Sequence, residues 1–366
     1  MELATLMSIF GLPLVLSGLS AFVISPLIIG IYKRLGWLDD PKKSKHPKVV
    51  HKYPVPRGGG VVIFLSLFIG TSLFLGLDKH AIGIMLGALI LTVIGIMDDV
   101  WDLNPYLRLG LGILAAGMVV AAGIGIAFIT NPFDGVIQLN EPQIAFYLFG
   151  KTRTIWVLAD LLAIVWIVWM MNMVNWSKGV DGQLPGYVVV AAIVIALLSF
   201  RFSEDVTQWN VSVLAAITAG AYLGFLPWNF YPQKIMPGYG GGSLAGYLLA
   251  VLSILSGAKL ATMILVLGVP TIDAVYAMGR RILKGKSPVW GDRGHLHHRL
   301  MDVGWGKRRI AVFYWLVAAA FGMIALNLNS TEKLFTIVLL VALFLGLMLW
   351  INYFGSLSAR QGRDSG

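Results

Sequence analysis

Two adjacent carboxylates, Asp98 and Asp99, directly follow an apolar run of the sequence. Two negative charges at the edge of a membrane repel one another, and their desolvation near lipid is costly unless a cation or proton compensates them. Hard divalent cations such as Mg²⁺ take carboxylate oxygens and complete their shells with phosphate and water. We interpret the pair as a candidate metal site. The alternative is that two solvated acids only end a helix.

A second polar group recurs every three residues at the end of the apolar run 154–175. Its members are Asn172, Asn175, Lys178 and Asp181. On a helical end this spacing predicts one shared face, and the intervening glycines would let a ligand approach the backbone. A polar stripe beside an apolar segment indicates a binding site, whereas the alternative is an interfacial helix end with turn glycines.

A third group combines three histidines with flanking arginines. It contains Arg293, His295, His297, His298 and Arg299. Clustered histidines suggest zinc, but the chain has no cysteine and the arginines would repel a divalent cation. Arginine and histidine donors instead suit diphosphate oxygens, because a planar guanidinium binds two oxygens at once. An ordinary basic loop is the alternative.

Two weaker candidates, His51 and Arg57, lie in a stretch stiffened by two prolines and followed by three glycines. The prolines restrict the approach to the next apolar segment, and the glycines permit tight turns. We interpret both side chains as possible donors to an anion.

The elements that position these side chains must lie in a lipid bilayer. Of the 366 residues, 57% are hydrophobic and 13% are charged, about half the charged fraction of an ordinary soluble domain. The polar stretches 33–57 and 280–309 are too short to be separate domains. We therefore exclude a soluble globular enzyme and expect an all-α polytopic membrane protein with a single transmembrane domain, 1–366.

A hydrocarbon core of about 30 Å requires about 20 helical residues. Eleven apolar segments approach that length, and the short eighth segment leaves ten or eleven predicted transmembrane helices. They are 6–33, 58–77, 81–97, 108–129, 154–175, 185–201, 210–227, 243–257, 260–283, 310–328 and 333–354. The Asn-Pro and Asp-Gly turns of 131–153 predict a small extracytoplasmic β-hairpin or surface loop.

Charge in the connecting segments predicts the orientation. If the segments alternate across the membrane, 22 of the 28 Lys and Arg residues lie on one face. The positive-inside rule makes that face cytoplasmic and places the N-terminus outside. Topology accounts for most of the net charge of +10, so we expect no nucleic-acid partner. The predicted cytoplasmic loops are 33–57, 98–108, 175–185, 228–242 and 280–309.

Six motifs in order resemble those of the polyprenyl-phosphate N-acetylhexosamine-1-phosphate transferases, which are glycosyltransferases of family 4. The motifs are His51…Pro56-Arg57-Gly-Gly, Gly95-x-x-Asp98-Asp99, Asn172-x-x-Asn175-x-x-x-Gly-x-Asp181-Gly, Gly224-Phe-Leu-Pro-Trp-Asn229, Pro270-x-x-Asp273 and Asp292-Arg-x-His295-x-His297-His298-Arg299. The likeness covers residues 33–302. The His-x-His-His-Arg form is more similar to the bacterial GlcNAc-1-phosphate branch than to the muramoyl-pentapeptide branch.

The resemblance implies transfer of HexNAc-1-phosphate, with GlcNAc as the expected sugar, from a UDP-sugar to undecaprenyl phosphate, with release of UMP. It implies Mg²⁺ or Mn²⁺ as cofactor, held by Asp98 and Asp99, in a multi-pass protein of the bacterial inner membrane whose site faces the cytoplasm. Such a step begins cell-envelope polysaccharides such as lipopolysaccharide or teichoic acid, and a homodimer stays open. The implied catalytic residues are Asp98, Asp99 and Asp181. The implied substrate-binding residues are His51, Arg57, Asn172, Asn175, Lys178, Asn229, His295, His297, His298 and Arg299.

The chain departs from the family pattern at two acidic positions. Lys178 stands where the family's Asn-x-x-Asn-x-x-Asp-Gly-x-Asp-Gly has its first acid, and the family's Gly-Asp-x-Gly-Ser is Gly238-Tyr239-Gly-Gly-Gly242-Ser243. The local formal charge changes by about +3, which weakens Mg²⁺ binding. Either Lys178 takes part of the metal's role at the diphosphate, or the chain binds lipid phosphate or nucleotide sugar without catalysis. A membrane transporter is the third alternative, and its expected sign is ionisable residues near the membrane midplane.

Overall fold

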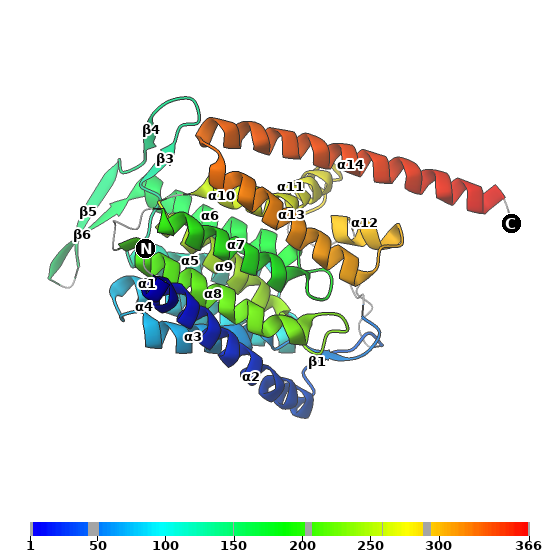
Figure 1. Cartoon of the computed structure of the whole chain (residues 1–366), viewed down its shortest axis with the longest axis horizontal. Helices are drawn as coiled ribbons and strands as arrows, with labels where there is room; N and C mark the ends of the chain where they lie inside the picture. Colours follow the sequence, from blue (N-terminus) through cyan, green and yellow to red (C-terminus); the bar gives the residue numbers. More distant parts are fainter. Residues whose placement is uncertain are drawn as a thin grey trace.

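The chain folds into a bundle of long apolar helices with three small antiparallel strand pairs among the described residues (Figure 1). The computed structural model describes residues 3–42, 51–148, 150–201, 207–257, 259–287 and 294–364. The helices are α1 (Leu3–Leu6), the π-helix η1 (Met7–Gly11), α2 (Leu12–Leu35), α3 (Gly59–Phe74), α4 (Lys79–Trp101), α5 (Pro105–Ala121), α6 (Val157–Trp176), α7 (Gln183–Phe200), α8 (Thr207–Asn229), α9 (Gly238–Leu255), α10 (Leu260–Val266), α11 (Gly268–Leu283), α12 (Leu296–Asp302), α13 (Lys307–Asn327) and α14 (Ser330–Asp364). The strands are β1 (Leu38–Asp39), β2 (Val55–Pro56), β3 (Phe128–Thr130), β4 (Val136–Gln138), β5 (Gln143–Leu148) and β6 (Lys151–Trp156).

The prediction of an all-α polytopic membrane fold is confirmed. Eight helices of the described ranges are long and apolar enough to cross a membrane, and the pair α10–α11, bent by 87°, makes a ninth. Two other predicted spans are the shorter apolar helices α3 and α5. All eleven predicted segments therefore overlap helices, although the number that qualifies by length and composition is eight or nine.

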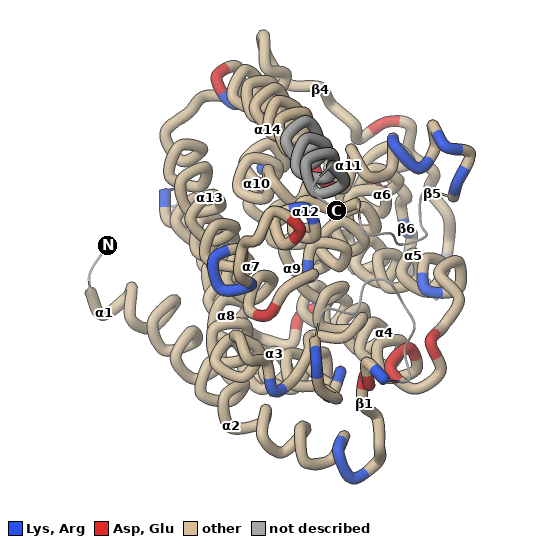
Figure 2. The backbone as a smooth tube through the Cα atoms, turned by 90° about the vertical axis from the view of Figure 1, so that its right-hand side faces the viewer, with Lys and Arg blue, Asp and Glu red and all other residues tan. Residues whose placement is uncertain are grey.

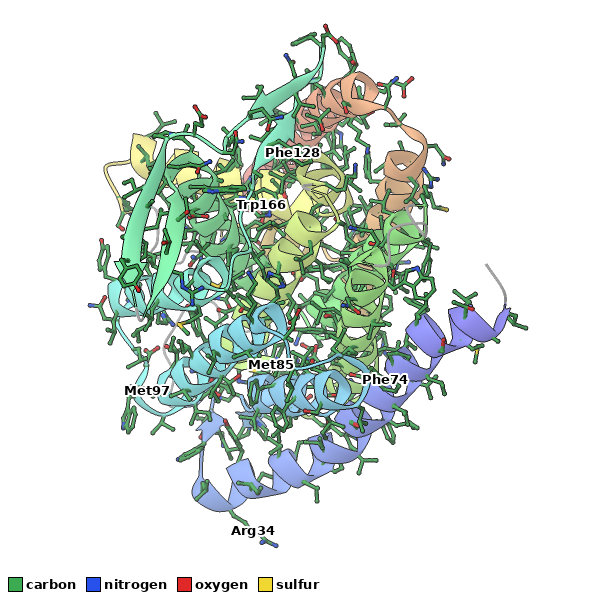
Figure 3. The ribbon with its side chains drawn as sticks, turned by 90° about the vertical axis from the view of Figure 1, so that its left-hand side faces the viewer. Arg34, Phe74, Met85, Met97, Phe128 and Trp166 are labelled. Carbon is green, nitrogen blue, oxygen red and sulfur yellow. The ribbon has the colours of Figure 1, made fainter. Side chains whose placement is uncertain are left out.

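The structure corrects one helix boundary. Hydropathy predicts a span that continues to residue 129, but α5 ends at Ala121 and strand β3 begins at Phe128. Apolar residues have the same hydropathy in a strand as in a helix, so the segment average does not detect the change. The hairpin predicted in 131–153 is confirmed and extended, because β3 pairs with β4 and β5 pairs with β6. Figure 3 looks onto these hairpins and labels Phe128 on the first of them.

The two ends of the bundle differ. The hairpins and the N-terminus lie at one end, here called the hairpin end, whereas α12 and β1 lie at the other, here called the loop end (Figure 1). Hydrogen bonds join the connections at the loop end: Tyr106 Oη lies 3.0 Å from Ser287 Oγ, and Tyr53 Oη donates to the Gln233 carbonyl at 3.1 Å. Figure 2 looks onto the loop end, where residues of both charges lie on the segments that join the helices.

Helix α9 lies in the core, since every residue from Gly238 to Ile254 is buried. Its glycines let neighbouring backbones touch. A Cβ added to Gly95 of α4 would lie 2.6 Å from Gly240 Cα, and one added to Gly60 of α3 would lie 2.8 Å from the Gly241 nitrogen. The loop-end termini of α3, α4 and α9 therefore lie close together, and the side chains at these termini form the site described next.

A carboxylate and cation cluster at the loop end

Asp98 is held in place within the last turn of α4. Its Oδ1 accepts from Arg108 Nη1 at 2.8 Å and from the Leu103 amide at 3.1 Å, and the residue is 5% exposed. Arg108 comes from the first turn of α5, which the Asn104 side chain caps by accepting from the Tyr106 amide. The short α4–α5 connection thus brings a guanidinium against the first predicted acid.

Asp99 differs from its neighbour because its buried Oδ1 has no hydrogen-bond partner. A Cβ added to Gly238 would lie 2.9 Å from this oxygen and 2.3 Å from the Arg57 carbonyl. Gly238 also has a positive φ of 64°, so both its backbone conformation and the close approach of its neighbours favour glycine. A buried acceptor without a donor requires an explanation, and a ligand that donates or is positively charged would supply one.

Lys178 lies in the turn between α6 and α7 and is partly buried. Its Nζ donates to the Gly238 carbonyl at the start of α9, and a Cβ added to Gly242 would lie 3.1 Å from its Cδ. Desolvation lowers the pKa of Lys178 to about 7, while the charges of Asp98 and Asp99 oppose that shift. The lysine side chain therefore lies along the glycines at the start of α9, Gly238 and Gly242, and its Nζ ends near both acids.

Arg57 brings a third cation to the same place. Its Nη2 pairs with Asp39 Oδ2 at 2.8 Å across the β1–β2 pair, and it also lies within electrostatic range of Asp98 and Asp99. His51 Nε2 lies 3.1 Å from the Asp39 carbonyl oxygen, so this histidine supports the strand pair. We call Arg57, Asp98, Asp99, Arg108 and Lys178 the carboxylate cluster.

The structure divides the predicted polar stripe 172–181. Helix α6 ends at Trp176, so Asn172 and Asn175 lie on the helix while Lys178 and Asp181 lie in the turn that follows. The Asn172 amide donates to the Val168 carbonyl of its own helix at 2.8 Å. Asn175 keeps a buried Oδ1 without a partner, and a Cβ on Gly242 would lie 2.4 Å from it. One helical face does not hold all four residues, because the helix ends between the second and the third.

Asp181 and Asn229 hold the shape of this turn. Asp181 Oδ1 pairs with Lys307 Nζ at 3.0 Å, and its Oδ2 accepts from the Gln233 amide at 3.3 Å. Asn229 Oδ1 accepts from the Gly182 amide at 3.1 Å, and its Nδ2 donates to the Ile235 carbonyl at 2.9 Å. Both residues are at most 2% exposed, and their observed contacts position the turn that carries Lys178.

Asp273 organises the histidine segment. Its Oδ2 lies 2.8 Å from His295 Nδ1, and its Oδ1 accepts from the Leu296 amide at the start of α12. His295 Nε2 lies 3.1 Å from Arg281 Nη2. Because a guanidinium only donates, Nε2 accepts and the proton of His295 is on Nδ1, where it meets the carboxylate. His295 is thus an orienting residue in this geometry.

His297 packs onto the turn that carries Lys178, and His298 packs against His297. The ring of His297 stacks on that of His295 with centroids 5.7 Å apart and lies 4.3 Å from that of His298. A Cβ on Gly179 would lie 1.8 Å from His297 Nε2, so only glycine leaves room for the imidazole there. Arg299 Nε donates to the Gly294 carbonyl at 3.2 Å. Asp292 and Arg293 lie outside the described residues.

Several residues that complete this arrangement are not predicted from the sequence. They are Asp39, Arg108, Arg281 and Lys307, each of which pairs with a predicted residue or its neighbour. Arg108 could have been found from the sequence, since it lies in the first turn after an Asn-Pro helix start that follows the two acids. The other three belong to distant parts of the chain and have no local signal.

Comparison with known proteins places these residues in a family context. The family model described as glycosyl transferase family 4 matches residues 81–257. A probable undecaprenyl-phosphate N-acetylglucosaminyl 1-phosphate transferase of Bacillus subtilis (strain 168) is 31% identical over 339 residues, which cover 89% of this chain and 88% of that protein. A decaprenyl-phosphate N-acetylglucosaminephosphotransferase of Mycobacterium tuberculosis (strain ATCC 25618 / H37Rv) is 28% identical over 353 residues, 85% of this chain and 83% of that one. A phospho-N-acetylmuramoyl-pentapeptide-transferase of Shouchella clausii (strain KSM-K16) is 27% identical over 327 residues, 86% and 96% of the two chains.

Proposed function

The chain belongs to glycosyl transferase family 4, and from this premise we propose that it transfers an N-acetylhexosamine 1-phosphate group from a UDP-sugar to a polyprenyl phosphate. The expected sugar is GlcNAc and the expected acceptor is undecaprenyl phosphate, in agreement with the name of the Bacillus subtilis relative. UMP is the second product. The step would initiate a cell-envelope polysaccharide.

One observation carries the proposal: three cations surround two adjacent acids at the end of a membrane-spanning bundle, and one acid has an unpartnered buried oxygen. Phosphoryl transfer between two anions requires charge neutralisation and alignment more than covalent catalysis. Arg57, Arg108 and Lys178 supply the positive charge for the phosphates. We place the loop end at the membrane surface, where an acceptor with a membrane-embedded tail would present its phosphate.

The reaction balances with the side chains present. An oxygen of the lipid phosphate bonds to the sugar-bearing phosphorus of the UDP-sugar, the bridge to the other phosphorus breaks, and UMP leaves with the bridging oxygen. Asp99 Oδ1, which is buried without a hydrogen-bond partner and lies near the Tyr32 hydroxyl, is the acceptor for a proton of the lipid phosphate. Asp98 is occupied by Arg108 and the Leu103 amide, so its role is to position Arg108.

The residues of the carboxylate cluster do not fit a resident divalent cation. Asp98 already has a guanidinium at 2.8 Å, and the Lys178 side chain lies near both Asp98 and Asp99. Across the described parts of the chain, no three His, Asp or Glu side chains gather into a metal site built by the protein alone. With Asp39 counted beside Arg57, adding a divalent cation would raise the local charge from about 0 to about +2. We therefore assign the compensation of phosphate charge to the side chains.

The proposed setting is the bacterial inner membrane, with the loop end in the cytoplasm and the N-terminus outside. The distribution of Lys and Arg supports this orientation, because most of them precede or follow helices at the loop end. A cytoplasmic site would also meet a charged UDP-sugar without requiring that it cross the bilayer.

Purified protein in detergent tests the activity. Given undecaprenyl phosphate and UDP-GlcNAc, it should release UMP, and added UMP should reverse the reaction because one phosphoanhydride is exchanged for another. The assay is run with several UDP-sugars, both with Mg²⁺ and with EDTA. Failure to release UMP in every combination contradicts a transferase. Binding of lipid phosphate in that case would identify a protein that retains the site without turnover.

A further inference from the structure

We propose that the Lys178 ammonium is the built-in cation of this site, and that it contacts the transferred phosphate in place of a divalent metal ion. The inference rests on the proposed function and concerns how the same site compensates phosphate charge. It follows from the position of Lys178, its unsatisfied hydrogen-bonding capacity and the charge around it.

The position of Lys178 is determined by three backbone elements. The turn 177–182 fixes its Cα. Its alkyl chain packs against Gly242 of α9, and the Gly238 carbonyl accepts a hydrogen bond from its Nζ. A Cβ added to Gly238 would lie 2.9 Å from Asp99 Oδ1, so the ammonium and this carboxylate oxygen share a neighbour. A cation placed between Asp99 and the start of α9 would compete with this ammonium for the same space.

The hydrogen-bond donors of the Lys178 ammonium are not all satisfied by the described residues. An ammonium has three N–H donors, and Lys178 has one acceptor, the Gly238 carbonyl, among the described residues. No carboxylate of those residues lies within ion-pair distance of its Nζ. Two donors therefore remain for a ligand, beside the carboxylate oxygen of Asp99 and the amide oxygen of Asn175 that also have no partner. A lysine that served only to satisfy its neighbours would not leave this combination.

The charge around Lys178 is balanced without a metal ion. Arg57, Arg108 and Lys178 together match Asp39, Asp98 and Asp99 in number, so the carboxylates present need no further cation. Replacing Lys178 by aspartate would change the balance from about 0 to about −2, which is the condition under which carboxylate oxygens recruit Mg²⁺ or Mn²⁺. The substitution should thus convert a metal-free site into a metal-binding one.

The test measures metal binding apart from catalysis. Mn²⁺ is titrated into nucleotide-free protein in detergent and bound ion is followed by electron paramagnetic resonance, for the natural chain, Lys178→Asp, Lys178→Gln and Lys234→Asp. Lys234 is an exposed lysine that stacks on Trp228, and its replacement by aspartate makes the same charge change away from the cluster. We expect Lys178→Asp to gain the most affinity, by about tenfold or more, and Lys234→Asp to gain none. Lys178→Gln should gain less than Lys178→Asp, because it removes the competing cation without adding a carboxylate.

Turnover supplies the second arm. UMP release by the natural chain should persist in EDTA, whereas that of Lys178→Asp should require Mg²⁺. Equal Mn²⁺ affinity in the natural chain and Lys178→Asp would overturn the inference, as would natural turnover that EDTA abolishes and Mg²⁺ restores. If no variant releases UMP with any donor, the proposed function fails, and the Mn²⁺ titration still decides the role of Lys178.

A Lys178→Asp variant that does not fold leaves the natural chain as the test. No Mn²⁺ binding together with turnover in EDTA then supports the inference. Mn²⁺ binding by the natural chain, or loss of its turnover in EDTA, overturns it.

Discussion

At the scale of single residues, the two adjacent acids have different surroundings, so substitution of Asp99 should lower turnover and substitution of Asp98 should lower stability. Asp99→Asn should lower kcat by about 10² without lowering the melting temperature, because its Oδ1 has no partner to lose in the free protein. Asp98→Ala should lower the melting temperature, because Arg108 and the Leu103 amide lose their acceptor at a cost of about 1–3 kcal/mol. Steady-state kinetics and thermal unfolding of each variant in detergent measure the difference.

Asp98→Asn is the control for this pair. It keeps an oxygen for Arg108 and the Leu103 amide while removing the charge, so it should unfold closer to the natural chain than Asp98→Ala does. A loss of stability in Asp99→Asn as large as that in Asp98→Ala would contradict the distinction between a free and an engaged carboxylate.

The ammonium of Lys178 makes a second prediction, on pH. Burial lowers its pKa to about 7 in the folded protein, whereas the ordinary value is 10.5. Between these values the unfolded chain binds more protons than the folded one, so the free energy of unfolding rises with pH, by at most about 1.4 kcal/mol per unit. Below pH 7 both states hold the proton and the contribution is constant.

Lys178→Met isolates this contribution, because every other titrating group is present in both proteins. The stability of the natural chain minus that of Lys178→Met should be constant below pH 7 and should increase from pH 7 toward pH 10. Melting temperatures in detergent across this range measure it. A difference that stays flat or decreases above pH 7 contradicts a lowered pKa.

At the scale of helices, glycine contacts set where the side chains of the cluster meet. Gly95→Ala should destabilise the protein by about 1–3 kcal/mol and lower turnover, because the added Cβ would lie 2.6 Å from Gly240 Cα and neither backbone can rotate away. Gly110→Ala on α5 is the matched control, since nothing lies within 4 Å of its added Cβ. Alanine favours a helix by up to about 1 kcal/mol over glycine, so this control should unfold at the same or a higher temperature.

Helices are also the level at which the sequence is most informative. The thickness of a bilayer imposes a length and a hydropathy on each spanning segment, so these segments can be recognised without knowing what they contact. The end of α5 is not predicted correctly, because residues 122–129 are as apolar as the helix before them. The face expected for residues 172–181 is wrong for a related reason: a spacing of three indicates a face only while the helix lasts, and α6 ends at Trp176.

Pairings between distant segments explain most of what the sequence does not predict about the candidate site. Asp39 with Arg57, Asp181 with Lys307 and Asp273 with His295 are separated by 18 to 126 residues. Their partners follow from how the helices pack, which hydropathy does not encode. The residue types of the carboxylate cluster, in contrast, are notable in the sequence because acids beside an apolar run need compensation.

At the scale of the whole molecule, the orientation of the bundle decides whether the cluster can meet a cytoplasmic nucleotide sugar. The chain has no cysteine, so a single introduced cysteine reports its own side of the membrane. Asp134→Cys lies in the exposed turn between β3 and β4, and Lys284→Cys lies in an exposed position at the end of α11. In intact bacterial cells a membrane-impermeant maleimide should label Asp134→Cys only.

Lys284→Cys should become reactive after the inner membrane is permeabilised, because basic residues at the loop end are retained in the cytoplasm. Labelling of both positions in intact cells, or of Lys284→Cys alone, contradicts the proposed orientation and would place the carboxylate cluster where a cytoplasmic UDP-sugar does not reach it.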